Sequence, residues 1–255
     1  MQRRFVMPDA RERPATAEQI HHMVDDTVVS GIMRTQASAA QVLQAVQWFR
    51  GGGGLEDPIG VANAQLYSEE LGLDLASGRE RDLFLWFLAS LLFGQRISEE
   101  IARNTYRAFV RHGLTSPQKI LAAGWAYLVN PIMREGGYVR YDESKSRKLL
   151  SACRMLVELY GGRLSRLHAA AGDDRDLERR LLDFYGVGPV TANIFLRELR
   201  PYWRKADPAP LPFVRALAQR MGIDLDRHDR HSLDFARLEA GLVRLRRVAR
   251  RNLAT

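Results

Sequence analysis

The spacing of apolar residues predicts helices along most of the chain. Residues 82–93, DLFLWFLASLLF, are apolar almost all round, which is typical of a helix buried on every side. Apolar residues at helical spacing continue over 98–113, 145–160 and 213–221. We find no run of alternating apolar and polar residues that would indicate a β-strand. The sequence therefore predicts an all-α protein.

Residues 180–199, RLLDFYGVGPVTANIFLREL, predict two helices joined by a tight glycine turn. Leu181, Leu182 and Phe184 complete the apolar face of the first helix, and Gly186 to Gly188 form the turn, where glycine adopts angles that other residues resist. Pro189 suits the first position of the second helix, because its missing N–H costs nothing there. The apolar side of that helix carries Thr191, Ala192, Ile194, Phe195 and Leu199. The unpaired N–H groups at its start form a seat for an anion such as a DNA phosphate.

Breaks between the predicted helices mark the remaining organisation. Before residue 82 we expect helices over 16–32 and 37–50, followed by the glycine run 51–54, which predicts a flexible joint. Ser98 caps the helix that follows the Gly94-Gln95 corner, with two glutamates in its first turn. Three prolines within 208–212 exclude a helix there.

Composition narrows the class of protein. The formal net charge of +8 suggests a polyanionic partner, and surface solubility is the alternative explanation. A single cysteine, Cys153, excludes a disulfide framework and a four-cysteine iron–sulfur cluster and indicates a reducing compartment. No apolar run approaches ~20 residues, and the N-terminus does not resemble a signal peptide. We therefore expect a soluble cytoplasmic, nucleoid-associated protein with no membrane partner.

The segment LLDFYGVGPVTAN resembles the helix-hairpin-helix of the endonuclease III-like DNA glycosylases, the HhH-GPD superfamily, whose pattern is L-P-G-V-G-x-x-T-A. Tyr185 stands where the family has proline. The likeness continues in order over 82–200 and includes the helix entry at Lys145. It implies a two-lobed helical fold with N-terminal helices over 1–81, a barrel lobe over 82–200, and an active-site loop with basic helices over 201–255. The N- and C-terminal parts together would form one lobe, with the cleft between the lobes.

The resemblance also implies contacts with DNA. Gln95 matches a glutamine that fills the space left by an extruded base, although it could instead cap its own loop. Backbone N–H groups around the hairpin would face a phosphate, and main-chain carbonyls would bind a K⁺ or Na⁺ ion. The matching hairpin residues are Gly186, Val187, Gly188, Val190 and Thr191 for DNA, and Leu182, Phe184 and Val187 for the cation.

For the chemistry, the resemblance points to one carboxylate. The family places a catalytic aspartate 16–17 residues after the hairpin threonine, and Asp207 lies 16 residues after Thr191. A carboxylate there stabilises the cation-like sugar and orients water. The prolines that follow depart from the family, and an aspartate in an Asp-Pro turn is the structural alternative. Val190 replaces the lysine of bifunctional members, which implies base removal without lyase activity.

The sequence therefore predicts a monomeric, monofunctional DNA glycosylase that flips a modified base out of double-stranded DNA and needs no cofactor for chemistry. The base stays open: alkylated, deaminated, oxidised or phage-type hypermodified. One alternative is a DNA-binding protein that lacks the chemistry. The other is a bifunctional glycosylase and lyase that uses Lys205.

Overall fold

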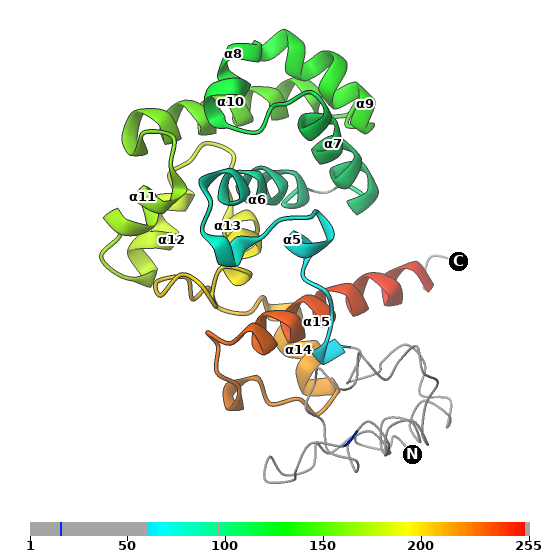
Figure 1. The fold of residues 1–255 in the computed structure, drawn as a ribbon. Helices are drawn as coiled ribbons and strands as arrows, with labels where there is room; N and C mark the ends of the chain where they lie inside the picture. The colour runs from blue at the N-terminus through cyan, green and yellow to red at the C-terminus, as the bar shows by residue number, and fades with distance from the viewer. Residues whose placement is uncertain (1–15, 17–60, 96, 253–255) are drawn as a thin grey trace. The chain divides into compact units, whose positions relative to one another are not determined.

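The computed structural model describes Thr16 and residues 61–95 and 97–252. These residues form helices joined by turns, and no strand occurs among them (Figure 1). The all-α prediction is thus confirmed for this part of the chain. The helices predicted over 16–32 and 37–50 lie outside the described residues, apart from Thr16. None of the described helices combines the length and apolar character needed to cross a membrane.

The chain divides into two compact units. One consists of Met1–Tyr67 together with Pro210–Thr255, and the other of Ser68–Ala209. The first unit is therefore built from both ends of the chain, and the second from one continuous segment. Both the predicted hairpin and Gln95 belong to the continuous unit.

Helix α6 (Glu80–Phe93) forms the core of the continuous unit. It packs against α7 (Glu99–Arg111), α11 (Leu164–Ala170) and α13 (Pro189–Arg197) (Figure 1). Every residue from Asp82 to Phe93 is buried, which confirms that this helix is enclosed on all sides. Trp86 fixes the crossing with α13, because its indole Nε1 donates to the carbonyl of Phe195 at 3.0 Å.

Polar side chains set the starts of the surrounding helices. Ser98 caps α7 as predicted, accepting the Ile101 N–H at 3.2 Å. Ser116 caps α8 (Pro117–Tyr127), and Asp173 caps α12 (Asp174–Leu182). Glu80, at the start of α6, accepts the Leu164 N–H at 2.9 Å and so begins α11.

A second layer of the same unit is formed by α8 and α10 (Asp142–Tyr160), which pack side by side (Figure 1). The buried side of α10 includes Leu149, Cys153 and Leu156. Gly124 breaks the regular geometry of α8 at a φ of +74°. Short elements complete the unit: η1 (Leu75–Ser77), η2 (Leu128–Met133) and α9 (Arg134–Gly136), with α5 (Tyr67–Glu70) at its boundary.

The other unit contains α14 (Pro212–Arg220), η3 (Leu225–Arg227) and α15 (Leu233–Asn252). Pro212 is the first residue of α14, so the proline run ends inside a helix rather than before it. The apolar stripe of α15 is buried at Leu238, Leu242, Val243 and Leu245. Gly241 lets the backbone at Val61 approach α15 closely, because a Cβ at this position would collide with that backbone.

Candidate functional site

The predicted hairpin is present as α12, a turn over 183–188, and α13. The turn is closed by two backbone hydrogen bonds, from Phe184 N–H to Leu181 at 3.2 Å and from Val187 N–H to Phe184 at 2.9 Å. Pro189 is the first residue of α13, as expected. The N–H groups of Val190 and Thr191 lie in the first turn of α13, where no intrahelical acceptor is in reach. The start of α13 therefore presents backbone N–H donors that no residue of the helix itself accepts.

The two glycines of the turn have different roles, which corrects the prediction that both need special backbone angles. Gly186 has a φ of +97°, and a Cβ there would lie 2.8 Å from the Cβ of Lys148. Gly188 caps α13 at a φ of −104°, an angle that any residue adopts. No heavy atom lies within 4 Å of a Cβ built on Gly188. The space in front of α13 is therefore open.

The apolar face of the first helix is narrower than predicted. Leu181 and Phe184 are buried, and the Phe184 ring packs edge-on against Phe87 at 5.6 Å. Leu182 was expected on the same face but is 39% exposed, because it lies one residue, or about 100° of rotation, past Leu181. Tyr185, the next residue but three after Leu181, is 61% exposed.

The Gln95 corner lies directly against the second helix of the hairpin. A Cβ at Gly94 would overlap the Thr191 hydroxyl, so the end of α6 touches α13 at these two residues. Thr191 is 2% exposed, and its side chain packs against the end of α6. Gln95 itself is half-buried, and its carbonyl accepts the Ile97 N–H at 2.9 Å.

A buried amine supports this corner. Lys145 is 2% exposed, and its Nζ donates to the carbonyl of Leu91 in the last turn of α6. Burial, with a smaller contribution from Lys148, lowers the pKa of Lys145 to about 7. The sequence marked Lys145 only as a helix entry, so its contact with α6 was not predicted.

Asp207 lies in the loop between α13 and α14, five residues before α14 begins. Its Oδ1 is 3.5 Å from Nε of Arg200, whose side chain is fully buried. The loop is held by two further contacts, from Asn193 Nδ2 to the Ala209 carbonyl at 2.9 Å and from Arg200 Nη2 to the Pro208 carbonyl. The carboxylate is thus fixed in place, and it neutralises a buried guanidinium.

Lys205, the alternative catalytic residue, is tied to the end of α11. Its Nζ donates to the carbonyl of His168 at 3.0 Å and also to those of Ala169 and Ala171. An ammonium group at the C-terminal end of a helix is favoured by the helix dipole. Trp203 is also internal, since its ring stacks on His168 at 4.6 Å.

The carbonyls expected to bind a cation, those of Leu182, Phe184 and Val187, surround the hairpin turn. The carbonyl of Phe184 already accepts the Val187 N–H, and its second lone pair is the one that a cation would use. The described residues contain no cluster of three or more His, Cys, Asp or Glu side chains suited to a metal.

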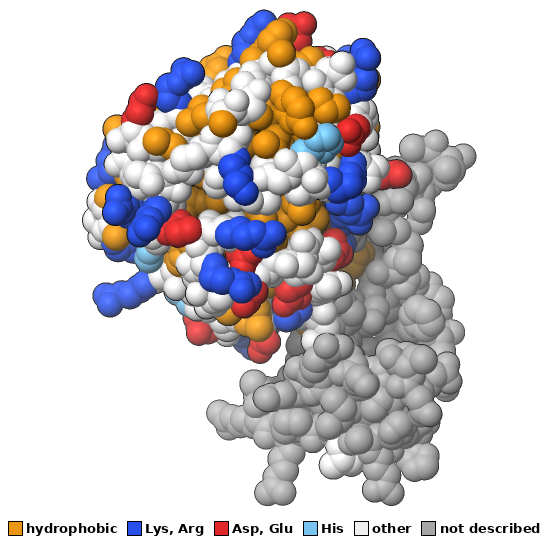
Figure 2. All heavy atoms as spheres, turned by 45° about the horizontal axis from the view of Figure 1, so that its top comes forward, with side chains coloured by type: hydrophobic (Ala, Val, Ile, Leu, Met, Phe, Trp, Pro, Cys, Tyr) orange, Lys and Arg blue, Asp and Glu red, His pale blue; other side chains and the backbone are white. Residues whose placement is uncertain are grey.

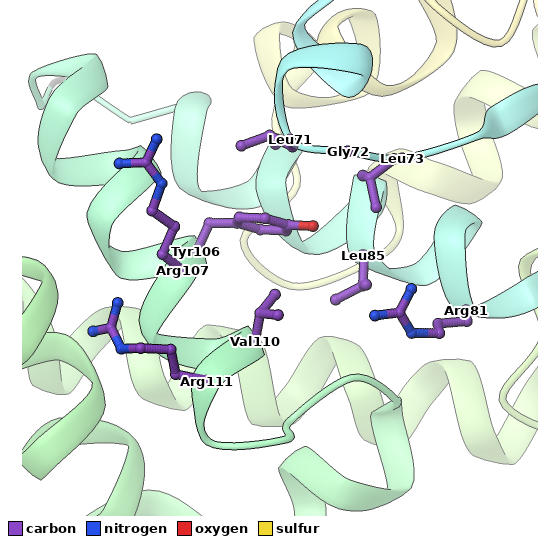
Figure 3. A pocket seen from close by; sticks show the side chains of 9 residues that line it. All are labelled: Leu71, Gly72, Leu73, Arg81, Leu85, Tyr106, Arg107, Val110 and Arg111. Atoms are coloured by element: carbon purple, nitrogen blue, oxygen red, sulfur yellow. The ribbon is translucent and has the colours of Figure 1, made fainter.

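A cavity of about 330 Å³ opens beside α6 and α7, and it involves neither the hairpin nor Asp207 (Figure 3). Its walls are apolar at Leu71, Leu73, Leu85 and Val110, and arginines 81, 107 and 111 surround it (Figure 3). The ring of Tyr106 lies across it, and burial raises the pKa of Tyr106 to about 12.

Comparisons with protein-family models, with curated proteins and with solved structures find no match to the chain.

Proposed function

We propose that the chain binds double-stranded DNA through the hairpin and removes a modified base as a monofunctional glycosylase. The contact between Gly94 and Thr191 is the observation that carries this proposal. It places the Gln95 corner beside the donors at the start of α13. A phosphate at α13 and a glutamine entering the base stack would then act on the same stretch of DNA.

Asp207 is the residue we propose for the chemistry. Removing a base creates positive charge on the sugar, and a fixed carboxylate stabilises that charge. Arg200 and Asn193 hold the Asp207 loop in one arrangement, which favours preorganisation. Lys205 is the weaker nucleophile candidate, because its Nζ is held by three carbonyls at the end of α11 and would have to leave them to attack a sugar.

DNA binding without base removal is the second candidate function. It is favoured by the ion pair between Asp207 and Arg200, since a carboxylate that balances a buried guanidinium already has a structural task. The Pro208 to Pro212 run after Asp207 favours the same reading. Both candidates require the hairpin to bind DNA, and they differ only in the chemistry.

The test uses a panel of duplexes that each carry one modified base, including phage-type hypermodified cytosine. Each duplex is incubated with wild type or Asp207→Asn and then treated with alkali, which cuts abasic sites. We expect cutting by wild type alone, and only after alkali. Equal cutting by both proteins would remove Asp207 from the mechanism. Cutting without alkali would support the lyase, and binding without any cutting would support the second candidate.

Gly188→Asp tests the hairpin in the same experiment. The position is open and its backbone accepts any residue, and aspartate is a favoured helix cap, so the variant should fold at least as well as wild type. Its charge, however, would repel a phosphate at the start of α13. We expect duplex affinity to fall about tenfold, a loss of roughly 1.4 kcal/mol. Gly188→Asn is the matched uncharged control, and equal affinity of the two variants would contradict a phosphate site.

A further inference from the structure

Exposed aromatic rings, each beneath a basic side chain, lie on the surface formed by α8, α10 and the hairpin. Arg147 lies over Trp125 at 5.6 Å, and Lys148 lies over Tyr185 at 6.0 Å. A third pair, Arg140 over Tyr141 at 5.4 Å, occurs where α10 begins. Figure 2 turns the top of Figure 1, where α8 and α10 lie, toward the viewer and shows hydrophobic, basic and acidic side chains intermixed there.

The two pairs on α10 are linked through the helix itself. Arg147 and Lys148 are consecutive, so their side chains diverge by about 100° and occupy adjoining sectors of the α10 surface. Trp125 is anchored to the same helix, because its Nε1 donates to the Glu143 carbonyl at 3.4 Å. The stem of Lys148 packs under Gly186, which brings the other end of the surface to the hairpin turn.

Both rings remain exposed despite their contacts with α10. Trp125 is 39% exposed and Tyr185 is 61% exposed. Large aromatic side chains stabilise a fold most when they are buried, and here both keep a substantial part of their surface in solvent. Alternating aromatic rings and cations are the features by which proteins bind single-stranded nucleic acid: bases stack on the rings while the cations contact the phosphates.

We infer that Trp125, Tyr185, Arg147 and Lys148 form a stacking track for an unpaired DNA strand that continues from the hairpin. This inference rests on the proposed function for the position of the strand at α13. It adds a second class of DNA to the duplex, namely single-stranded or locally opened DNA. One ring of the track is Tyr185, which stands where the family that the hairpin resembles has proline. The track is therefore not implied by that resemblance.

Glu143 provides an internal check on the role of Arg147. Its carboxylate is 3.2 Å from the Arg147 guanidinium, and both side chains are largely exposed. A phosphate on the track would compete with this carboxylate for Arg147. Glu143→Gln should therefore tighten binding of an unpaired strand by about twofold, since exposed ion pairs of this kind are weak.

The main test measures fluorescence anisotropy of a labelled oligothymidine strand of roughly a dozen nucleotides and of a blunt duplex. We expect Trp125→Ala and Tyr185→Ala each to raise the Kd for the strand about fivefold or more. The Kd for the duplex should change less than about twofold. Trp125→Phe should keep most of the affinity, because phenylalanine retains a stacking face. Leu159→Ala is the matched control, because Leu159 is an exposed apolar residue about 18 Å along α10 from Arg147. This variant should not change the Kd for the strand.

Three results would overturn the inference. Both alanine variants could bind the strand as wild type does, or they could lose strand and duplex affinity equally. A wild-type preference for oligouridine over oligothymidine of about tenfold or more would assign the track to RNA. Failure of the hairpin proposal gives a different result. In that case Gly188→Asp would bind duplex with the affinity of wild type, while Trp125→Ala would still bind the single strand more weakly than wild type does.

Discussion

Lys145 shows how a single residue links the stability of the fold to the site. A buried ammonium is costly, and its donation to the Leu91 carbonyl offsets part of that cost. The acceptor lies in the last turn of α6, where carbonyls lack intrahelical partners and the helix dipole favours positive charge. The amine thus completes the end of the helix that leads into the Gln95 corner.

Stability should depend on pH through this residue. Burial lowers the pKa of Lys145 to about 7 from 10.5, so between these values the unfolded chain binds more protons than the folded chain. The free energy of unfolding therefore rises with pH across this window. In Lys145→Met that contribution is absent. We expect the difference in Tm, wild type minus variant, to increase from pH 7 to pH 9 in scanning calorimetry.

The exposed Lys119→Met is the control for loss of a lysine, and the increase with pH should be specific to Lys145→Met. A difference for Lys145→Met that stays constant with pH would contradict the lowered pKa of Lys145. Met fills a similar volume but leaves the Leu91 carbonyl without its donor, which costs about 1–3 kcal/mol at every pH. That loss shifts the whole profile without changing its slope, so the two effects separate.

The burial and the contacts of individual side chains were the hardest features to predict from the sequence. Leu181 and Leu182 look equivalent in the sequence, yet only the first is buried, because α13 and α11 pack against one side of the nine-residue helix α12. Tyr202 and Trp203 are likewise adjacent, and only Trp203 is internal. The partners of Lys145 and Asp207 depend on helices distant in sequence, and no local pattern reports such contacts.

The positions of the helices were easier to predict than the burial of their residues, because capping residues and glycines are local signals of where a helix begins and ends. Ser98 begins α7, and Pro189 begins α13, as their positions indicated. What the sequence did not report is how closely the elements approach. Gly94 could be read as a helix end, whereas its contact with Thr191 makes it a packing glycine between α6 and α13.

Replacing that glycine should therefore destabilise the helix crossing. A Cβ at Gly94 overlaps Thr191 Oγ1, so in Gly94→Ala either the buried Thr191 side chain or the two helices must shift. Overpacking of this kind costs about 1–3 kcal/mol, and we expect Tm to fall by roughly 2–10 °C. Gly172→Ala is the control, since nothing lies within 4 Å of its Cβ.

The double variant Gly94→Ala, Thr191→Ala identifies the cause. Removing the Thr191 hydroxyl relieves the overlap, and the two changes should then cost less together than the sum of their separate costs. Calorimetry of the four proteins measures this coupling. Additive losses would place the damage elsewhere in α6 and would weaken the case that this crossing positions Gln95.

At the scale of the whole molecule, the net charge of +8 has two explanations, a solvated basic surface or cations that contact DNA phosphates. Salt separates them. Each phosphate that a cation neutralises releases counterions and steepens the dependence of log Kd on log salt. Stacked rings add affinity but release no counterions. Removing a ring should therefore weaken binding without changing the salt dependence, whereas removing a cation should change both.

We therefore predict that basic and aromatic residues of the track affect different quantities when the oligothymidine titration is repeated over a range of salt. The basic residues should change the slope of log Kd against log salt, and the aromatic residues should change the affinity alone. Arg147→Gln with Lys148→Gln should lower the slope by about 1.4, since each cation on a single strand contributes about 0.7. Trp125→Ala should weaken binding at every salt concentration and keep the slope of wild type. Arg107→Gln, beside the cavity on α7, is the charge control and should change neither. If Arg107→Gln lowered the slope as much per charge as the α10 pair, the strand would be attracted by the diffuse charge of the molecule rather than held by α10.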